Sequence, residues 1–198
     1  QKGHERALEK GASLSGAFEL LKKFRVNDKK TPIVFMGYMN TFESLGANKF
    51  MQEAVKASLD GILIVDMPPE ESSNFSIEAE KVGVDIIRLI APTTSSSRAK
   101  KICSQCSGYV YYISVKGITG ASNINAEEVK AKVSELRSHT DLPIAIGFGI
   151  KDSSSASSVK DVADGVVVGS VFVDLIGEGG NIIEKVESKT KELSEVLS

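Results

Sequence analysis

The chain has 198 residues, of which 41% are hydrophobic and 25% are charged, and its formal net charge is −2. This composition is typical of a globular protein with a core of its own, and we expect a single domain over residues 1–198. No cluster of Lys and Arg is interleaved with aromatic residues, and no apolar run reaches membrane length. We therefore expect neither a nucleic-acid partner nor a membrane partner, and a cytoplasmic location.

Helical patterns and short apolar runs alternate along the chain. Two helices are expected first, over residues 4–10 and 13–24. Nearly continuous apolar runs, typical of parallel strands that are covered on both faces, then predict strands at Ile33–Tyr38, Gly61–Val65, Asp85–Ile90, Tyr109–Ser114, Pro143–Gly147 and Gly165–Val168. A period near 3.6 predicts helices at Thr41–Lys56, Glu70–Val82, Ser95–Gln105, Asn125–Ser138, Asp152–Ala163 and Asn181–Leu197.

This alternation predicts an α/β fold with parallel strands. A (β/α)8 TIM barrel closes with about eight strands. Six are visible here, so the barrel interpretation places two missing strands on the N-terminal side. An open, doubly wound six-stranded sheet is the alternative, but no glycine-rich turn follows the first visible strand, Ile33–Tyr38. In a barrel, the last two strands here are the seventh and eighth, whose loops commonly form a phosphate site.

Those last two strands both end in glycine. One runs into Gly147-Phe148-Gly149, and the other runs into Gly169-Ser170. A turn without side chains in front of a helix can present several backbone N–H groups to a phosphate. The sequence therefore predicts a phosphorylated small-molecule ligand at this end of the two strands.

Other candidate residues lie where the remaining strands end. Tyr38 and Tyr111 can line a pocket or fill the mouth of a barrel. Asp66 is a candidate acid or base, although a carboxylate in this place can equally order the next loop. The loop Lys116–Gly120, with two glycines around a threonine, is interpreted as a lid over the ligand. We expect His4 and His139 to be solvated, so the residues alone give no convincing catalytic pair.

The two cysteines, Cys103 and Cys106, have C-x-x-C spacing, which a redox pair or half a zinc site would also have. No second cysteine pair exists, and neither histidine is close in sequence. We interpret them as two small residues near the end of a helix, and expect no metal.

Taken together, the motifs resemble the tryptophan synthase alpha subunit. The resemblance covers essentially the whole chain in order, and its matching pieces include Pro32–Asn40, Asp60–Pro68, Tyr111–Ala121, Ile146–Ile150 and Gly165–Ser170. Their combination is specific, although Gly147-Phe148-Gly149 and Val167-Val168-Gly169-Ser170 alone occur in many phosphate-binding barrels. The pair Val115-Lys116 departs from the family's commoner Arg-Ala or Thr-Gly at the start of the lid, but Gly117 through Ala121 are intact.

The resemblance implies a lyase of tryptophan biosynthesis that splits indole-3-glycerol phosphate into indole and glyceraldehyde 3-phosphate by a retro-aldol reaction. It implies no cofactor in this subunit. It also implies an alpha2beta2 heterotetramer, in which indole passes to a beta subunit that holds pyridoxal phosphate.

The resemblance also assigns the site residues. The phosphate would be bound by Gly120, Gly149, Gly169 and Ser170, and the indole pocket would be lined by Met36, Leu63 and Phe148. Tyr38 is a further substrate-binding candidate, Tyr111 would lie beside the glycerol, and Thr119 would bind a catalytic carboxylate when the lid closes. Asn40 and the loop Asp66–Pro68 would face the beta subunit.

The family's two catalytic carboxylates lie at and just after a strand that this chain does not contain, so we expect no catalytic residue here and an inactive chain. Two alternatives are another phosphate-binding barrel enzyme, such as a sugar-phosphate isomerase, and a non-catalytic fragment that binds phosphate or the partner.

Overall fold

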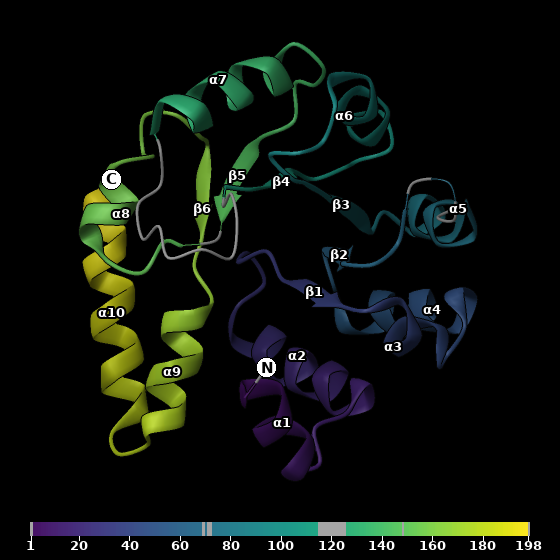
Figure 1. The fold of residues 1–198 in the computed structure, drawn as a ribbon. Helices are drawn as coiled ribbons and strands as arrows, with labels where there is room; N and C mark the ends of the chain where they lie inside the picture. Colours follow the sequence, from purple (N-terminus) through teal and green to yellow (C-terminus); the bar gives the residue numbers. More distant parts are fainter. Residues whose placement is uncertain (1, 69, 71–72, 115–125, 148, 198) are drawn as a thin grey trace. The chain divides into compact units, whose positions relative to one another are not determined.

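Figure 1 shows the computed structural model, which describes residues 2–68, 70, 73–114, 126–147 and 149–197. The chain divides into two compact units. Unit 1 comprises Gln1–Leu89 with Gln105–Gly108, and unit 2 comprises Ile90–Ser104 with Tyr109–Ser198. Within the described residues, no helix is long and apolar enough to cross a membrane.

Unit 1 alternates helices with parallel strands. The strands pair in the order β1-β2-β3, with Met36 opposite Leu63 and Leu63 opposite Ile87. Its elements, in chain order, are α1 (Lys2–Glu9), α2 (Leu14–Asn27), β1 (Val34–Gly37), α3 (Met39–Glu43), α4 (Ala47–Ala57), β2 (Gly61–Ile64), α5 (Ser73–Val82) and β3 (Asp85–Ile90).

Aromatic residues build the core of unit 1. Phe50 is fully buried, and its ring centroid lies 5.1 Å from that of Phe42 and 5.3 Å from that of Phe18. Such pairs contribute about 0.5–1.5 kcal/mol each beyond the burial of their area. These ring contacts pack α2, α3 and α4 against one another, and so hold in place the helices before and after β1.

One expected helix of unit 1 is two helices. The pattern over Thr41–Lys56 predicted a continuous helix, but α3 ends at Glu43 and α4 begins at Ala47. The break lies at Gly46, whose φ of 74° belongs to the left-handed region that favours glycine. The apolar period continues across the break because both helices bury side chains in the same core.

Unit 2 repeats the same alternation. Its strands pair in the order β4-β5-β6, all parallel, with Tyr111 opposite Ala145 and Ala145 opposite Gly165. Its elements are α6 (Ser96–Cys103), β4 (Val110–Ile113), α7 (Ala126–Arg137), β5 (Ile144–Gly147), α8 (Ser153–Ser157), β6 (Gly165–Val167), α9 (Ser170–Glu178) and α10 (Ile182–Leu197). All six predicted strands are therefore present, each within two residues of its expected ends.

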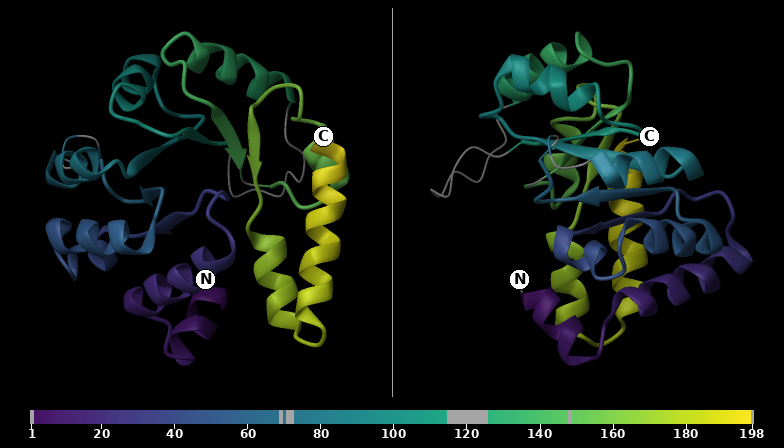
Figure 2. Two further views of the ribbon diagram at one scale, coloured as in Figure 1. Left: turned by 180° about the vertical axis from the view of Figure 1, so that it is seen from behind. Right: turned by 90° about the vertical axis from the view of Figure 1, so that its right-hand side faces the viewer.

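Two helices of unit 2 differ from expectation. The helix predicted over Asp152–Ala163 is confined to α8, Ser153–Ser157. No range was predicted for helix α9, whose start over residues 170–173 is apolar and β-branched and has no side-chain cap. The φ angles of Gly179 and Gly180, 72° and 76°, separate α9 from α10 and allow the two helices to lie side by side (Figure 2).

Candidate functional site

The register of β5 and β6 brings the two glycine-ended turns together. Gly147 on β5 is the register partner of Val167 on β6. Gly149 follows Gly147 by two residues, and Gly169 follows Val167 by two residues. Neighbouring strands are about 4.8 Å apart. Backbone groups of both turns therefore lie together at the carboxyl ends of β5 and β6 in unit 2, as the sequence predicted.

Helix α9 begins at the carboxyl end of β6, and its N-terminus has no side-chain cap. Gly169 is its N-cap residue and Ser170 its first residue. The first N–H groups of a helix have no partner within the helix, and the helix dipole gives this end a partial positive charge. A bound anion at Gly169 and Ser170 would satisfy these N–H groups.

No described neighbour explains why residue 169 is a glycine. A Cβ atom built there meets nothing within 4 Å, and the φ of −125° is open to any residue. No described residue therefore fills the space in front of Gly169, and a ligand could approach the backbone closely. Gly149 differs, because its φ of 86° itself favours glycine.

The wall of this site contains a close contact between Tyr111 and Gly147. A Cβ atom at Gly147 would lie 2.2 Å from the Tyr111 hydroxyl oxygen. Tyr111 is buried, and this burial raises the pKa of its hydroxyl, with a smaller contribution from Tyr109. Ser114 donates to the Gly147 carbonyl from both its N–H and its hydroxyl, each at 3.0 Å. The ring and the end of β5 thus fix each other's position.

Two of the candidates for the apolar pocket, Met36 and Leu63, lie in unit 1. Met36 and Leu63 are register partners on β1 and β2; Met36 is 60% exposed, whereas Leu63 is fully covered. Tyr38 is 56% exposed and is the N-cap residue of α3. Exposed Met36 and Tyr38 side chains next to a strand end can contact an aromatic ligand.

Asp66 has a structural partner. Its Oδ1 atom accepts a hydrogen bond from the N–H of Met39, in the first turn of α3, at 2.7 Å. The carboxylate therefore joins the loop after β2 to the loop after β1. Of the two roles considered for Asp66, this contact supports the ordering of the loop.

Four predicted positions fall outside the described residues. They are Lys116, with the lid that it begins, and the site residues Thr119, Gly120 and Phe148. Cys103 is the last residue of α6 and is buried, and this burial raises the pKa of its thiol. Among the described residues, no group of His, Cys, Asp and Glu could hold a metal ion.

Sequence analysis missed two polar groups. Arg88, on β3, is only 4% exposed, and its guanidinium donates to the carbonyls of Met67 and Gln105, each at 3.4 Å, and to the Ser76 hydroxyl at 3.3 Å. The signal was a charged residue inside an apolar run. His139 was expected to be solvated, but its side chain is 15% exposed and its Nε2 atom lies 3.1 Å from the Ser96 hydroxyl.

Comparisons with known proteins agree with the fold and the motifs. The family model for the tryptophan synthase alpha chain matches residues 1–198. The alpha chain of Polynucleobacter asymbioticus is 42% identical over 199 residues, which cover all of this chain and 75% of the relative. That of Paraburkholderia phymatum is 43% identical, with 73% of the relative covered.

Solved structures give the same result. The alpha subunit from Legionella pneumophila matches 98% of this chain and 72% of its own, with 32% identity and a TM-score of 0.87. A structure of the tryptophan synthase a2b2 complex from Pyrococcus furiosus matches 97% of this chain and 78% of its own, with 36% identity and a TM-score of 0.87. The predicted fold class is thereby confirmed as the α/β class of these TIM barrels, and the chain belongs to the tryptophan synthase alpha chain family.

Proposed function

We propose that unit 2 binds the phosphate group of indole-3-glycerol phosphate. The observation that carries this proposal is the equivalent placement of Gly149 and Gly169 beyond the β5–β6 register, at the uncapped start of α9. The N–H groups and the Ser170 hydroxyl would bind the phosphate oxygens. Gly120 would add a further N–H group from the loop after β4.

The organic part of the substrate would contact apolar and aromatic side chains. Met36, Leu63 and Phe148 would line the indole pocket, Tyr38 would contact the substrate, and Tyr111 would lie beside the glycerol. A tyrosine hydroxyl is neutral at physiological pH, and burial raises the pKa of Tyr111 further, so this hydroxyl could donate a hydrogen bond. Thr119 would act from the lid.

The reaction we propose for the complete enzyme is a retro-aldol cleavage of the lyase type, with no cofactor in this subunit. Two carboxyl groups would transfer the protons. Asp66 is not a good candidate for either role, because it already binds the Met39 N–H. We propose that both catalytic groups lie outside this chain, which by itself would be inactive.

Indole would pass to a beta subunit that carries pyridoxal phosphate. The related structure from Pyrococcus furiosus is described as an a2b2 complex, which supports a partner of this kind. Asn40 and the loop Asp66–Pro68 would face that partner. Family membership weighs against the sugar-phosphate isomerase alternative, whereas binding without turnover remains our proposal for the chain alone.

Substitution of Gly169 tests the phosphate site. Aspartate at an N-cap satisfies the first N–H groups of a helix and stabilises it, but its charge opposes a phosphate. We expect Gly169→Asp to fold and to lose most phosphate and glyceraldehyde 3-phosphate binding in calorimetric titrations. Gly169→Asn is the matched neutral control and should lose less. Equal binding by the aspartate variant and the unsubstituted chain would refute the proposal.

A further inference from the structure

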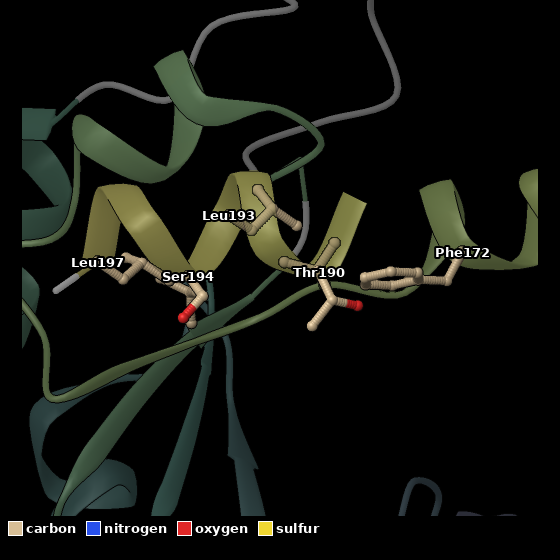
Figure 3. Close-up of a pocket in the computed structure, with 7 residues that line it drawn as sticks. Phe172, Thr190, Leu193, Ser194 and Leu197 are labelled. Carbon is tan, nitrogen blue, oxygen red and sulfur yellow. The ribbon is translucent and has the colours of Figure 1, made fainter. Parts of the chain in front are cut away.

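Arg88, on β3, is the only charged side chain that is buried among the described residues, at 4% exposed. By contrast, no charged residue lines the groove that Val166, Val168, Phe172 and helix α10 form in unit 2 (Figure 3). Removing a guanidinium from water costs free energy, which ion pairs or hydrogen bonds must offset. No described residue forms an ion pair with Arg88. The position of Arg88 therefore depends on its hydrogen bonds.

The hydrogen bonds of Arg88 connect three segments of unit 1. Its Nη1 donates to the Met67 carbonyl and its Nε to the Gln105 carbonyl, each at 3.4 Å, and its Nη2 donates to the Ser76 hydroxyl at 3.3 Å. Met67 follows β2, Ser76 lies in α5, and Gln105 precedes β4. Ile86, on the same face of β3, belongs to the core cluster of unit 1. The guanidinium therefore lies on the face of β3 that the helices cover.

The carbonyl of Met67 needs a hydrogen-bond donor because it is buried. The Met67 side chain lies in the same core cluster as Phe75 and Ala79 of α5, and the hydrogen bond from Arg88 is itself buried. A buried carbonyl without a partner costs free energy comparable to a lost hydrogen bond. Arg88 supplies this partner, and so fixes the direction in which the backbone continues after β2.

A second contact anchors the loop after β2 on the side of β1. The N–H of Val65 donates to the Gly37 carbonyl at 2.9 Å, which continues the pairing of β2 with β1. Directly after it, Asp66 accepts a hydrogen bond from the Met39 N–H at 2.7 Å. Met67 is the next residue, and its carbonyl is bound from β3 instead. The loop is therefore held by α3 on one side and by β3 on the other.

We propose that Arg88 is a positioning residue, which holds the loop Asp66–Pro68 in the conformation that the beta subunit would meet. Arg88 is buried, so it would act through the Met67 carbonyl and would not touch the partner. An apolar side chain of similar length could fill the same space without the cost of a buried charge. What the guanidinium adds is three directed hydrogen bonds to segments that are far apart in sequence. The role toward the partner rests on the proposed function, whereas the ordering of the loop does not.

The experiment compares three variants with the unsubstituted 198-residue chain. Arg88→Met fills most of the same space and removes every donor. Arg88→Lys, the conservative variant, keeps the charge and one flexible donor group. Ser76→Ala is the matched control, because it removes one acceptor of the guanidinium and leaves the hydrogen bond to Met67.

Hydrogen exchange at single amides, measured by NMR, reports the order of the loop. We expect Arg88→Met to speed exchange at the Met39 amide, which donates to Asp66, at least about tenfold. The reference is the amide of Asp85 at the start of β3, whose own hydrogen bond to a backbone carbonyl is 2.8 Å long, and its rate should not change. Arg88→Lys should speed exchange at Met39 less than Arg88→Met, and Ser76→Ala should leave it unchanged.

Two exchange results would overturn the proposal. One is an unchanged rate at Met39, and the other is an equal acceleration at Met39 and Asp85, which would be a general loss of stability. If Arg88→Met does not fold, the comparison of Arg88→Lys with the unsubstituted chain decides the question at the same two amides.

The role toward the partner is measured separately, by calorimetric titration of each variant with the beta subunit of the Pyrococcus furiosus complex. We expect Arg88→Met to weaken binding at least about tenfold and Ser76→Ala to leave it unchanged. Equal affinities of Arg88→Met and the unsubstituted chain would overturn this role. If the unsubstituted chain does not bind the beta subunit, the proposed partner is refuted instead, and the exchange rates still decide whether Arg88 positions the loop.

Discussion

The ring of Tyr111 occupies the space where a side chain of residue 147 would begin. A Cβ atom at Gly147 would approach the hydroxyl oxygen of Tyr111 to 2.2 Å and the Cε2 atom to 2.3 Å. The two residues lie on the neighbouring strands β4 and β5. This contact explains why β5 ends in glycine, independently of any role in ligand binding.

We expect Gly147→Ala to destabilise the protein by about 1–3 kcal/mol, because the buried ring must move. Urea denaturation measures the effect. Gly165→Ala on β6 is the control, since a Cβ atom there meets nothing within 4 Å. In the background of Tyr111→Ala, the cost of Gly147→Ala should largely disappear. Equal costs in both backgrounds would show that the ring is not the cause.

Arg88→Ala should destabilise the protein by about 2–4 kcal/mol, because it leaves a cavity and three acceptors without their donor. Those acceptors, on Met67, Ser76 and Gln105, belong to three segments of unit 1. Arg137→Ala is the control, since Arg137 forms an exposed ion pair with Asp164 and should cost less than about 1 kcal/mol. Similar urea midpoints for the two variants would contradict a special role for the buried guanidinium.

Asp28 contributes to the dependence of folding stability on pH in acid. The Thr31 hydroxyl and the N–H groups of Thr31 and Lys30 donate to this carboxylate and lower its pKa from 3.8 to about 2. A carboxylate with a lowered pKa adds stability above pH 3.8, and this contribution is lost as the pH falls toward 2. Urea midpoints of Asp28→Asn should therefore fall less steeply than those of the unsubstituted chain across this range. Parallel curves would disprove the assignment.

The inactivity proposed for the chain alone is tested by indole release. We expect no release above background from indole-3-glycerol phosphate, even where phosphate binding is measurable. The alpha chain of Polynucleobacter asymbioticus, assayed under the same conditions, is the positive control. Turnover comparable to that control would show that the catalytic acid and base lie within these 198 residues.

The six strands could be predicted from sequence because each is a short, nearly continuous apolar run. The glycine-ended turns after β5 and β6 were found for the same reason, since local composition marks them. The split between α3 and α4 was missed, because helical periodicity does not record the backbone angle that Gly46 adopts.

Sequence alone determined the order of the six strands, their parallel class and the two glycine turns, because apolar runs and glycines are local features of the chain. Only the tertiary structure decided which residues share a site or a contact. The register of β5 and β6 places Gly149 and Gly169 at equivalent positions. The Met39 N–H donates a hydrogen bond to Asp66, and three segments that are distant in sequence surround Arg88. These relationships depend on packing between residues far apart in sequence, and local patterns do not encode which side chain fills the space left by a glycine.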